Sequence, residues 1–134
     1  MQLPKGLQNF VKSQGVARIA TIGDDGVPHN VPVCPVWVDG KVYVASEKTA
    51  RKVKNIHSNP AATITFDVYR DSWKELRGVM LQCTGRIVDE KLFKKIRRNL
   101  YTKYPKYKTD APLEPEDSVI IELVPEKKFS WGFE

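Results

Sequence analysis

Two Asp-Gly dipeptides, at residues 25–26 and 39–40, constrain the fold of this chain more than any other feature of its sequence. Asp and Gly tolerate the positive φ angles that tight hairpin turns require. The segments that flank these dipeptides are rich in Val and Ile, which favour strands: residues 16–22, 27–38 and 41–45. The sequence therefore predicts a meander of three antiparallel strands over residues 16–45.

The rest of the chain is predicted to alternate between helices and further strands. Apolar residues at helical spacing predict helices at residues 3–14, 50–57 and 90–104, bounded by Gly15, Thr49 and Asp89. Strands are predicted at residues 61–70, 76–88, 118–124 and 129–133, and loops at 70–75 and 105–115. Six or seven strands interrupted by three helices indicate one antiparallel α+β domain spanning residues 1–134.

Length and composition are those of an ordinary globular domain. The chain has 134 residues, of which 41% are hydrophobic and 28% charged. It contains no apolar run of about 18 residues, and its first residues lack the apolar core of a signal peptide. Cys34 and Cys83 form no Cys-x-x-Cys pair and are expected to be reduced thiols. We therefore expect a cytoplasmic protein with no membrane association.

Several common catalytic patterns are missing from the sequence. It has no P-loop, no Gly-x-Gly-x-x-Gly and no nucleophile elbow, so NTPase, Rossmann and serine hydrolase functions lack support. His29 and His57 have no Cys or carboxylate at metal-ligand spacing. We expect both histidines to be structural or exposed, and we predict no metal site and no protein acid or base.

The segment Ser46–Lys52 is the first candidate binding site. Basic residues cluster at the start of the predicted helix: Lys48, Arg51, Lys52 and Lys54. A helix N-terminus already carries about half a positive charge, so cations there are unfavourable by roughly 0.3–1 kcal/mol each. A bound phosphate would reverse that cost, because free N–H groups and nearby cations both favour an anion. The alternative is a solvated basic face without a ligand.

The second candidate is the segment Pro28–Pro35, which holds three prolines inside a predicted strand. Proline cannot donate to a β-ladder, so this strand is predicted to lie at an edge or to be interrupted. The remaining N–H donors at Val31, Val33 and Cys34 could then face a flat heteroaromatic ring instead of a neighbouring strand. The alternative is an edge strand that its prolines protect against aggregation.

The predicted helix 90–104 carries a second basic cluster, which contributes to the net charge of +6. Its outer face would suit a nucleic acid or another polyanion. Tyr101 and Tyr104 also fit the apolar stripe of this helix, and a core position is the simpler interpretation of both. We expect no nucleic-acid partner, and we keep a polyanion-binding module as an alternative of another class.

The order of these pieces resembles the flavin-binding split-barrel family of pyridoxamine 5′-phosphate oxidase-like proteins. The resemblance covers about residues 10–90 and is carried by Ala17–Ile22, Asp25–Pro28, Val31–Val33, Val42–Ser46, Arg51-Lys52 and Asn59-Pro60. It implies a six-stranded antiparallel Greek-key split β-barrel with flanking helices. It also implies a homodimer with flavin sites at the interface, an oxidoreductase activity, and FMN as cofactor, with the deazaflavin F420 as the alternative.

The resemblance also assigns site residues. The proline-rich strand would lie along the flavin ring, through Val31, Pro32, Val33 and Cys34. The phosphate would be held by Ala45, Ser46, Ala50, Arg51 and Lys52. Further cofactor contacts are expected from Gln82, often on the second subunit, and from Trp131 in the tail.

Two positions depart from the family's pattern. True pyridoxamine phosphate oxidases carry an arginine at the position of Val31 and a serine at that of Ala50. Their C-terminal Arg/His signature is also missing, because the chain ends in Ser-Trp-Gly-Phe-Glu. We therefore predict a flavoprotein with an unassigned substrate and not a vitamin B6 oxidase.

Overall fold

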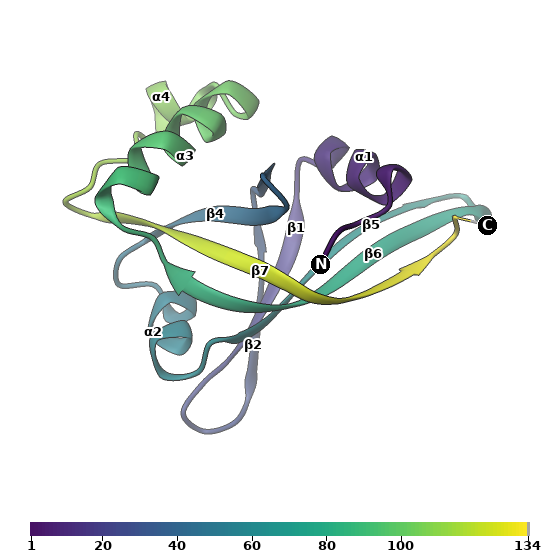
Figure 1. Ribbon diagram of the computed structural model, residues 1–134, viewed down its shortest axis with the longest axis horizontal. Coiled ribbons are helices and arrows are strands. Elements are labelled where there is room, and N and C mark those ends of the chain that lie inside the picture. Colours follow the sequence, from purple (N-terminus) through teal and green to yellow (C-terminus); the bar gives the residue numbers. More distant parts are fainter. Residues whose placement is uncertain (134) are drawn as a thin grey trace.

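The computed structural model describes residues 1–133 as one curled β-sheet with helices packed against it (Figure 1). The helices are α1 (Lys5–Ser13), α2 (Arg51–Ser58), α3 (Glu90–Lys103) and α4 (Lys106–Asp110). The strands are β1 (Ala17–Ile22), β2 (Pro28–Val33), β3 (Val36–Val38), β4 (Lys41–Glu47), β5 (Ala61–Arg70), β6 (Ser72–Ile87) and β7 (Ser118–Trp131).

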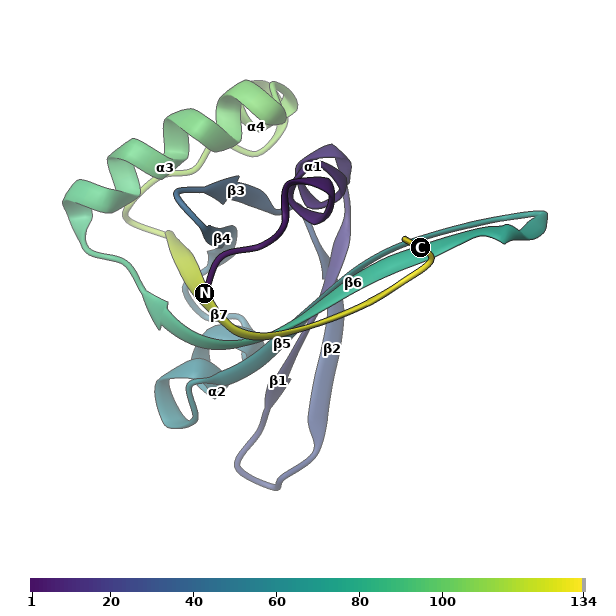
Figure 2. The same cartoon turned by 45° about the vertical axis from the view of Figure 1, so that its right-hand side comes forward.

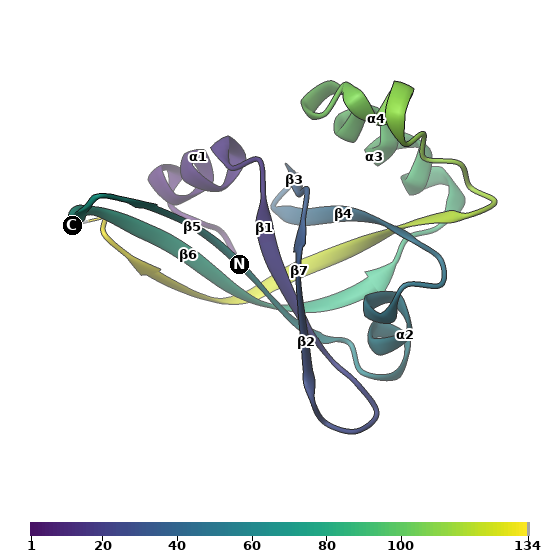
Figure 3. The ribbon, with the colours of Figure 1, turned by 180° about the vertical axis from the view of Figure 1, so that it is seen from behind.

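The seven strands form one antiparallel sheet in the order β2-β1-β5-β6-β7-β4-β3. The predicted split-barrel class is confirmed, with seven strands in place of six. The extra strand arises because the predicted strand 27–38 breaks at Cys34-Pro35 into β2 and β3. These two strands lie at opposite edges of the sheet, yet only two residues join them. The sheet must therefore curl until its edges nearly meet, as Figure 3 shows from behind.

Both predicted hairpin turns are confirmed. Gly26 has a φ of 78°, and the Gly23 N–H donates to the Val27 carbonyl across the β1–β2 turn at 3.2 Å. Asp39 and Gly40 have φ angles of 52° and 79°, so both central residues of the β3–β4 turn lie in the left-handed region. Positive φ at two successive residues matches the twist of a two-residue hairpin.

Two hydrophobic cores lie against opposite parts of the curled sheet. The larger one fills the curl and includes Phe10 of α1, Ile56 of α2 and Phe66 of β5. The smaller one lies between α3 and the strands β3, β4 and β7, and includes Phe93 and Ile120. Figure 2 shows α3 and α4 together over this side of the sheet.

Strands β5, β6 and β7 continue beyond the sheet's centre as a long arm (Figure 1). The predicted loop 70–75 is wrong, because β5 ends at Arg70 and β6 begins at Ser72. The predicted strands 118–124 and 129–133 are one continuous strand, β7. Pro125 does not interrupt β7, because the register of the β6–β7 pairing shifts beside it, between Gln82 and Cys83 of β6. A bulge accommodates a proline without the loss of a ladder bond.

Helix ends account for the remaining differences. Asp89 caps α3 as predicted, and its side chain accepts the Leu92 N–H at 2.9 Å. The predicted loop 105–115 contains the short helix α4. Helix α1 ends at Ser13 with Gln14 as its C-terminal cap, so Gly15 lies one residue beyond the cap.

Candidate functional site

Strand β2 is an edge strand, paired only with β1 among the described strands. Hydrogen-bonded and non-hydrogen-bonded pairs alternate in antiparallel ladders, and the Gly23–Val27 bond fixes the phase. Pro28 and Pro32 therefore occupy positions whose N–H would point away from β1. The two prolines therefore remove no hydrogen bond from the β1–β2 ladder, as expected of an edge strand.

The same alternation directs the N–H groups of Val31 and Val33 toward β1. This corrects the expectation that these two amides face a ligand. Of the three donors considered, only that of Cys34 lies beyond the paired residues of β2. The Val31 side chain is half-buried and that of Val33 is buried, whereas Pro32 is exposed. Along this edge, exposed side chains therefore alternate with half-buried or buried ones, and the Cys34 amide lies at the point where the strand breaks.

The start of α2 is uncapped and basic. Ala50 occupies the N-cap position instead of Thr49, and no side chain accepts a hydrogen bond from the helix start. Among the hydrogen bonds of residues 1–133, none satisfies the N–H groups of Arg51 and Lys52. The first turn contains no acidic residue, while Arg51 is exposed and Lys52 half-buried. Burial lowers the pKa of Lys52, an effect that the nearby Glu47 carboxylate partly offsets.

Helix α3 is a useful contrast, because its N-terminus is satisfied within the chain. The Asp89 carboxylate caps it and Glu90 lies in its first turn. Helix α2 has neither feature and carries two cations instead. Free amides and cations at one helix start form the donor set that a phosphate requires. The residues present at α2 therefore fit a phosphate group.

The end of β4 leads into this helix start and borders a cavity of about 530 Å³. Ser46 is buried, and its hydroxyl donates to the Glu47 carbonyl at 3.0 Å. The cavity is lined by residues 45–49 on one side and by residues 107, 111–113 and 116–118 on the other. Arg51 and Lys52 do not line it. The structure thus brings Ala45 and Ser46 to the cavity and places the two cations outside it.

Gln82 and Trp131 lie elsewhere on the molecule. Gln82 borders a second cavity, of about 560 Å³, on the β1–β5–β6 part of the sheet. Trp131 pairs with Gly78 in the arm, and a side chain at Gly78 would overlap its indole ring. The cavity beside Ser46 contains neither Gln82 nor Trp131, and the cavity beside Gln82 contains neither Ser46 nor Arg51. One subunit alone therefore does not gather all the predicted contacts.

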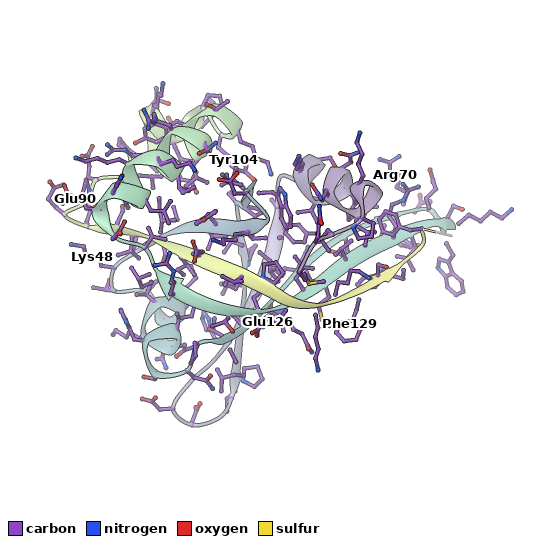
Figure 4. All side chains as sticks on the ribbon, viewed as in Figure 1. Lys48, Arg70, Glu90, Tyr104, Glu126 and Phe129 are labelled. Atoms are coloured by element: carbon purple, nitrogen blue, oxygen red, sulfur yellow. The ribbon has the colours of Figure 1, made fainter. Side chains whose placement is uncertain are left out.

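No sequence pattern indicated the polar contacts that hold the break after β2. Lys103 Nζ donates to the carbonyls of Gln14 and Pro35, at 2.7 and 2.8 Å. Tyr104 OH lies 2.7 Å from the same Pro35 carbonyl, and Figure 4 shows Tyr104 on the side of α3 nearest the sheet. Because Pro35 is buried and its carbonyl lies outside both strands, these donors satisfy it and fix the β2–β3 corner.

No group of three or more His, Cys, Asp or Glu residues within 1–133 is arranged to hold a metal ion. In the same part of the chain, no helix has the length and apolar character needed to cross a membrane. Lys94 and Lys95 of α3 pair with Glu90 and Asp39, respectively.

The curled antiparallel sheet and its flanking helices define a split-barrel fold. A model of the pyridoxamine 5′-phosphate oxidase family matches residues 3–132, so the chain belongs to this family. A comparison with curated proteins gives no match.

Solved structures share the fold at low sequence identity. A conserved hypothetical protein from Mycobacterium tuberculosis has a TM-score of 0.82 and 21% identity, over 98% of this chain and 85% of that one. The heme storage protein HutZ from Vibrio cholerae has a TM-score of 0.79 and 18% identity, over 96% and 94% of the two chains. An F420 reductase has a TM-score of 0.76 and 21% identity, over 95% and 98%. These similarities establish the fold alone.

Proposed function

We propose that this protein is an FMN-binding oxidoreductase whose phosphate site is the start of α2. The observation that carries the proposal is the uncapped helix start, where two free amides adjoin Arg51 and Lys52. Membership of the family supports a flavin, and the phosphate distinguishes FMN from riboflavin. When bound, the flavin would supply the electron transfer, and the protein would supply position and electrostatics.

The residues of the chain have separate roles in this proposal. Arg51 and Lys52 hold the phosphate, and the buried Ser46 lies one residue before the end of β4, the strand that leads into their helix. The β2 edge and the Cys34 amide lie along the ring. Val31 and Ala50 stand where vitamin B6 oxidases have an arginine and a serine, so we propose a substrate other than pyridoxamine phosphate.

We further propose a homodimer in which both subunits contribute to each site. The separation of Gln82 and Trp131 from α2 supports this arrangement, since a second copy could supply them. The arm also exposes large apolar side chains, which are typical of interaction surfaces: Tyr69, Trp73, Leu76, Phe129 and Trp131. Figure 4 shows Phe129 projecting from the arm. We propose a cytoplasmic location, on the basis of the two free cysteines.

The test compares FMN with riboflavin, which lacks the phosphate. We expect the wild-type protein to bind FMN more tightly, and an Arg51→Ala/Lys52→Ala variant to lose that preference. Removal of a charge-assisted hydrogen bond costs about 1.5–3 kcal/mol. Arg51 is exposed, so we expect the lower end of that range, which is roughly tenfold or more in the Kd for FMN.

Lys91→Ala/Arg98→Ala is the matched control, because it removes two exposed α3 cations that form no ion pair within residues 1–133. Salt-sensitive binding of an oligonucleotide that survives in the α2 variant and is lost in this control would support the polyanion-binding alternative instead. Tighter binding of F420 than of FMN by the wild type would favour the deazaflavin alternative.

A further inference from the structure

Helix α2 carries a polar side chain on its buried face. Its buried residues are Val53, Asn55 and Ile56, and Asn55 is only 5% exposed. Its Nδ2 donates to Thr21 Oγ1 of β1 at 3.0 Å, and Thr21 is 0% exposed. Asparagine is mostly found at protein surfaces, and a buried amide is destabilising unless it has a partner. This bond is therefore a specific, directional link between the helix and the sheet.

A second contact holds the next residue of the same helix. The Ile56 side chain packs on Gly85 of β6, where its Cδ1 lies 3.2 Å from the position a Cβ would take. Successive helical residues point about 100° apart around the axis. Asn55 against β1 and Ile56 against β6 therefore fix the rotation of α2 about its own axis. Figure 3 shows α2 beside the β1–β2 hairpin.

These two anchors determine where the start of the helix points. Residues four apart lie on one face of a helix, so Arg51 precedes Asn55 by one turn and Lys52 precedes Ile56 by one turn. The apolar Ile56 contact is non-directional and tolerates small rotations. The hydrogen bond is directional and tolerates them poorly. The angle of the two cations and their amides thus depends mainly on the Thr21–Asn55 bond.

We propose that the buried Thr21–Asn55 hydrogen bond orients the start of α2 and thereby sets the preference of this site for a phosphorylated over an unphosphorylated flavin. Asn55 and Thr21 are positioning residues, because neither lies at the helix start itself. The inference rests on the proposed function, and its test separates the two.

The experiment measures the Kd values of FMN and riboflavin, and thermal unfolding, for the full chain and three variants. Thr21→Val removes the hydroxyl and keeps the side-chain shape. Thr21→Ser keeps the hydroxyl. Thr21→Val/Asn55→Leu replaces both partners with apolar groups, which restores a satisfied core.

We expect Thr21→Ser to retain the wild-type FMN-to-riboflavin preference. Thr21→Val and the double variant should lose about tenfold of that preference, since small misplacements of binding groups have effects of that size or larger. The double variant should regain thermal stability relative to Thr21→Val without regaining the preference. A merely structural role predicts that the preference recovers together with stability.

The outcomes distinguish the two levels of the proposal. If the wild type binds FMN and riboflavin equally, the phosphate site itself is refuted, and the positioning role with it. If the wild type prefers FMN and the double variant keeps the full preference, the positioning role alone is refuted. If the double variant fails to fold, the positioning role is tested by comparing Thr21→Val with Thr21→Ser. Equal FMN-to-riboflavin preferences in these two variants overturn the inference.

Discussion

Replacing Tyr43 with phenylalanine should destabilise the fold by removing one partner of a buried carboxylate. Tyr43 OH donates to Glu122 Oε2 at 2.8 Å, and the Glu122 side chain is 3% exposed. Arg86 Nε donates to the other oxygen at 2.7 Å, and its Nη2 lies 3.3 Å from Oε2. In the variant, Oε2 therefore keeps only that longer contact.

The expected magnitude follows from the charge of the acceptor. A hydrogen bond to a charged group contributes about 1.5–3 kcal/mol to stability. For a chain of this length, 1 kcal/mol corresponds to a change in Tm of about 3–5 °C, so Tyr43→Phe should lower Tm by about 5–15 °C. Tyr69→Phe is the matched control, because Tyr69 is 60% exposed and makes no hydrogen bond among the described side chains.

The effect should depend on pH. Burial raises the pKa of Glu122, but hydrogen bonds from Arg86 and Tyr43 and the guanidinium charge outweigh it, so the net shift is downward. A carboxyl with a lowered pKa stabilises the fold above its unfolded pKa of about 4.3, and that stability is lost as pH falls through the folded pKa. Burial also raises the pKa of Tyr43, so its hydroxyl remains a donor throughout this range.

Thermal unfolding of wild type and Tyr43→Phe from pH 7 down into the acid range tests this reasoning. The difference in Tm should be largest at pH 7 and should shrink below about pH 4, as Glu122 becomes protonated. Equal Tm values at pH 7, or a difference that stays constant into strong acid, would refute the role assigned to the ionised carboxylate.

Three further predictions concern helix ends and the arm. Asp89→Ala should lower stability by about 1 kcal/mol, measured by denaturant unfolding, because the Leu92 N–H loses its cap; an unchanged midpoint would contradict this. Gly78→Ala should displace the Trp131 indole and shift tryptophan fluorescence toward that of exposed indole; the same shift in a Trp131→Phe background would contradict the assignment. FMN affinity should weaken as pH rises through the lowered pKa of Lys52, because the neutral amine no longer attracts phosphate, and Lys52→Arg should abolish that dependence.

Local patterns predicted most of the elements of this fold. The Asp-Gly turns, the Asp89 cap and the proline-broken edge strand all depend on residues adjacent in sequence, whose φ angles and missing donors are fixed by chemistry. The number of strands was harder to predict. The strand before Cys34-Pro35 pairs at one edge of the sheet, and the strand after it pairs at the opposite edge. Whether a strand breaks there depends on long-range pairing, which no local window contains.

The candidate site was predictable to the same extent. The basic start of α2 follows from Arg51 and Lys52, which stand in a pattern that helices usually avoid. The Thr21–Asn55 bond and the Lys103–Pro35 contact join residues 34 and 68 positions apart, so no local pattern identifies both partners of either contact. The polar Asn55 between the apolar Val53 and Ile56 was the available indication, since a buried amide implies a partner on another element.

The identity of the cofactor that accompanies the purified protein tests the central proposal most directly. An absorption spectrum, followed by mass analysis of the ligand released on denaturation, distinguishes the candidates without assuming a substrate. We expect a flavin spectrum and the mass of FMN. Release of a deazaflavin or of heme in its place, or a colourless protein that does not bind added FMN, would contradict the proposal.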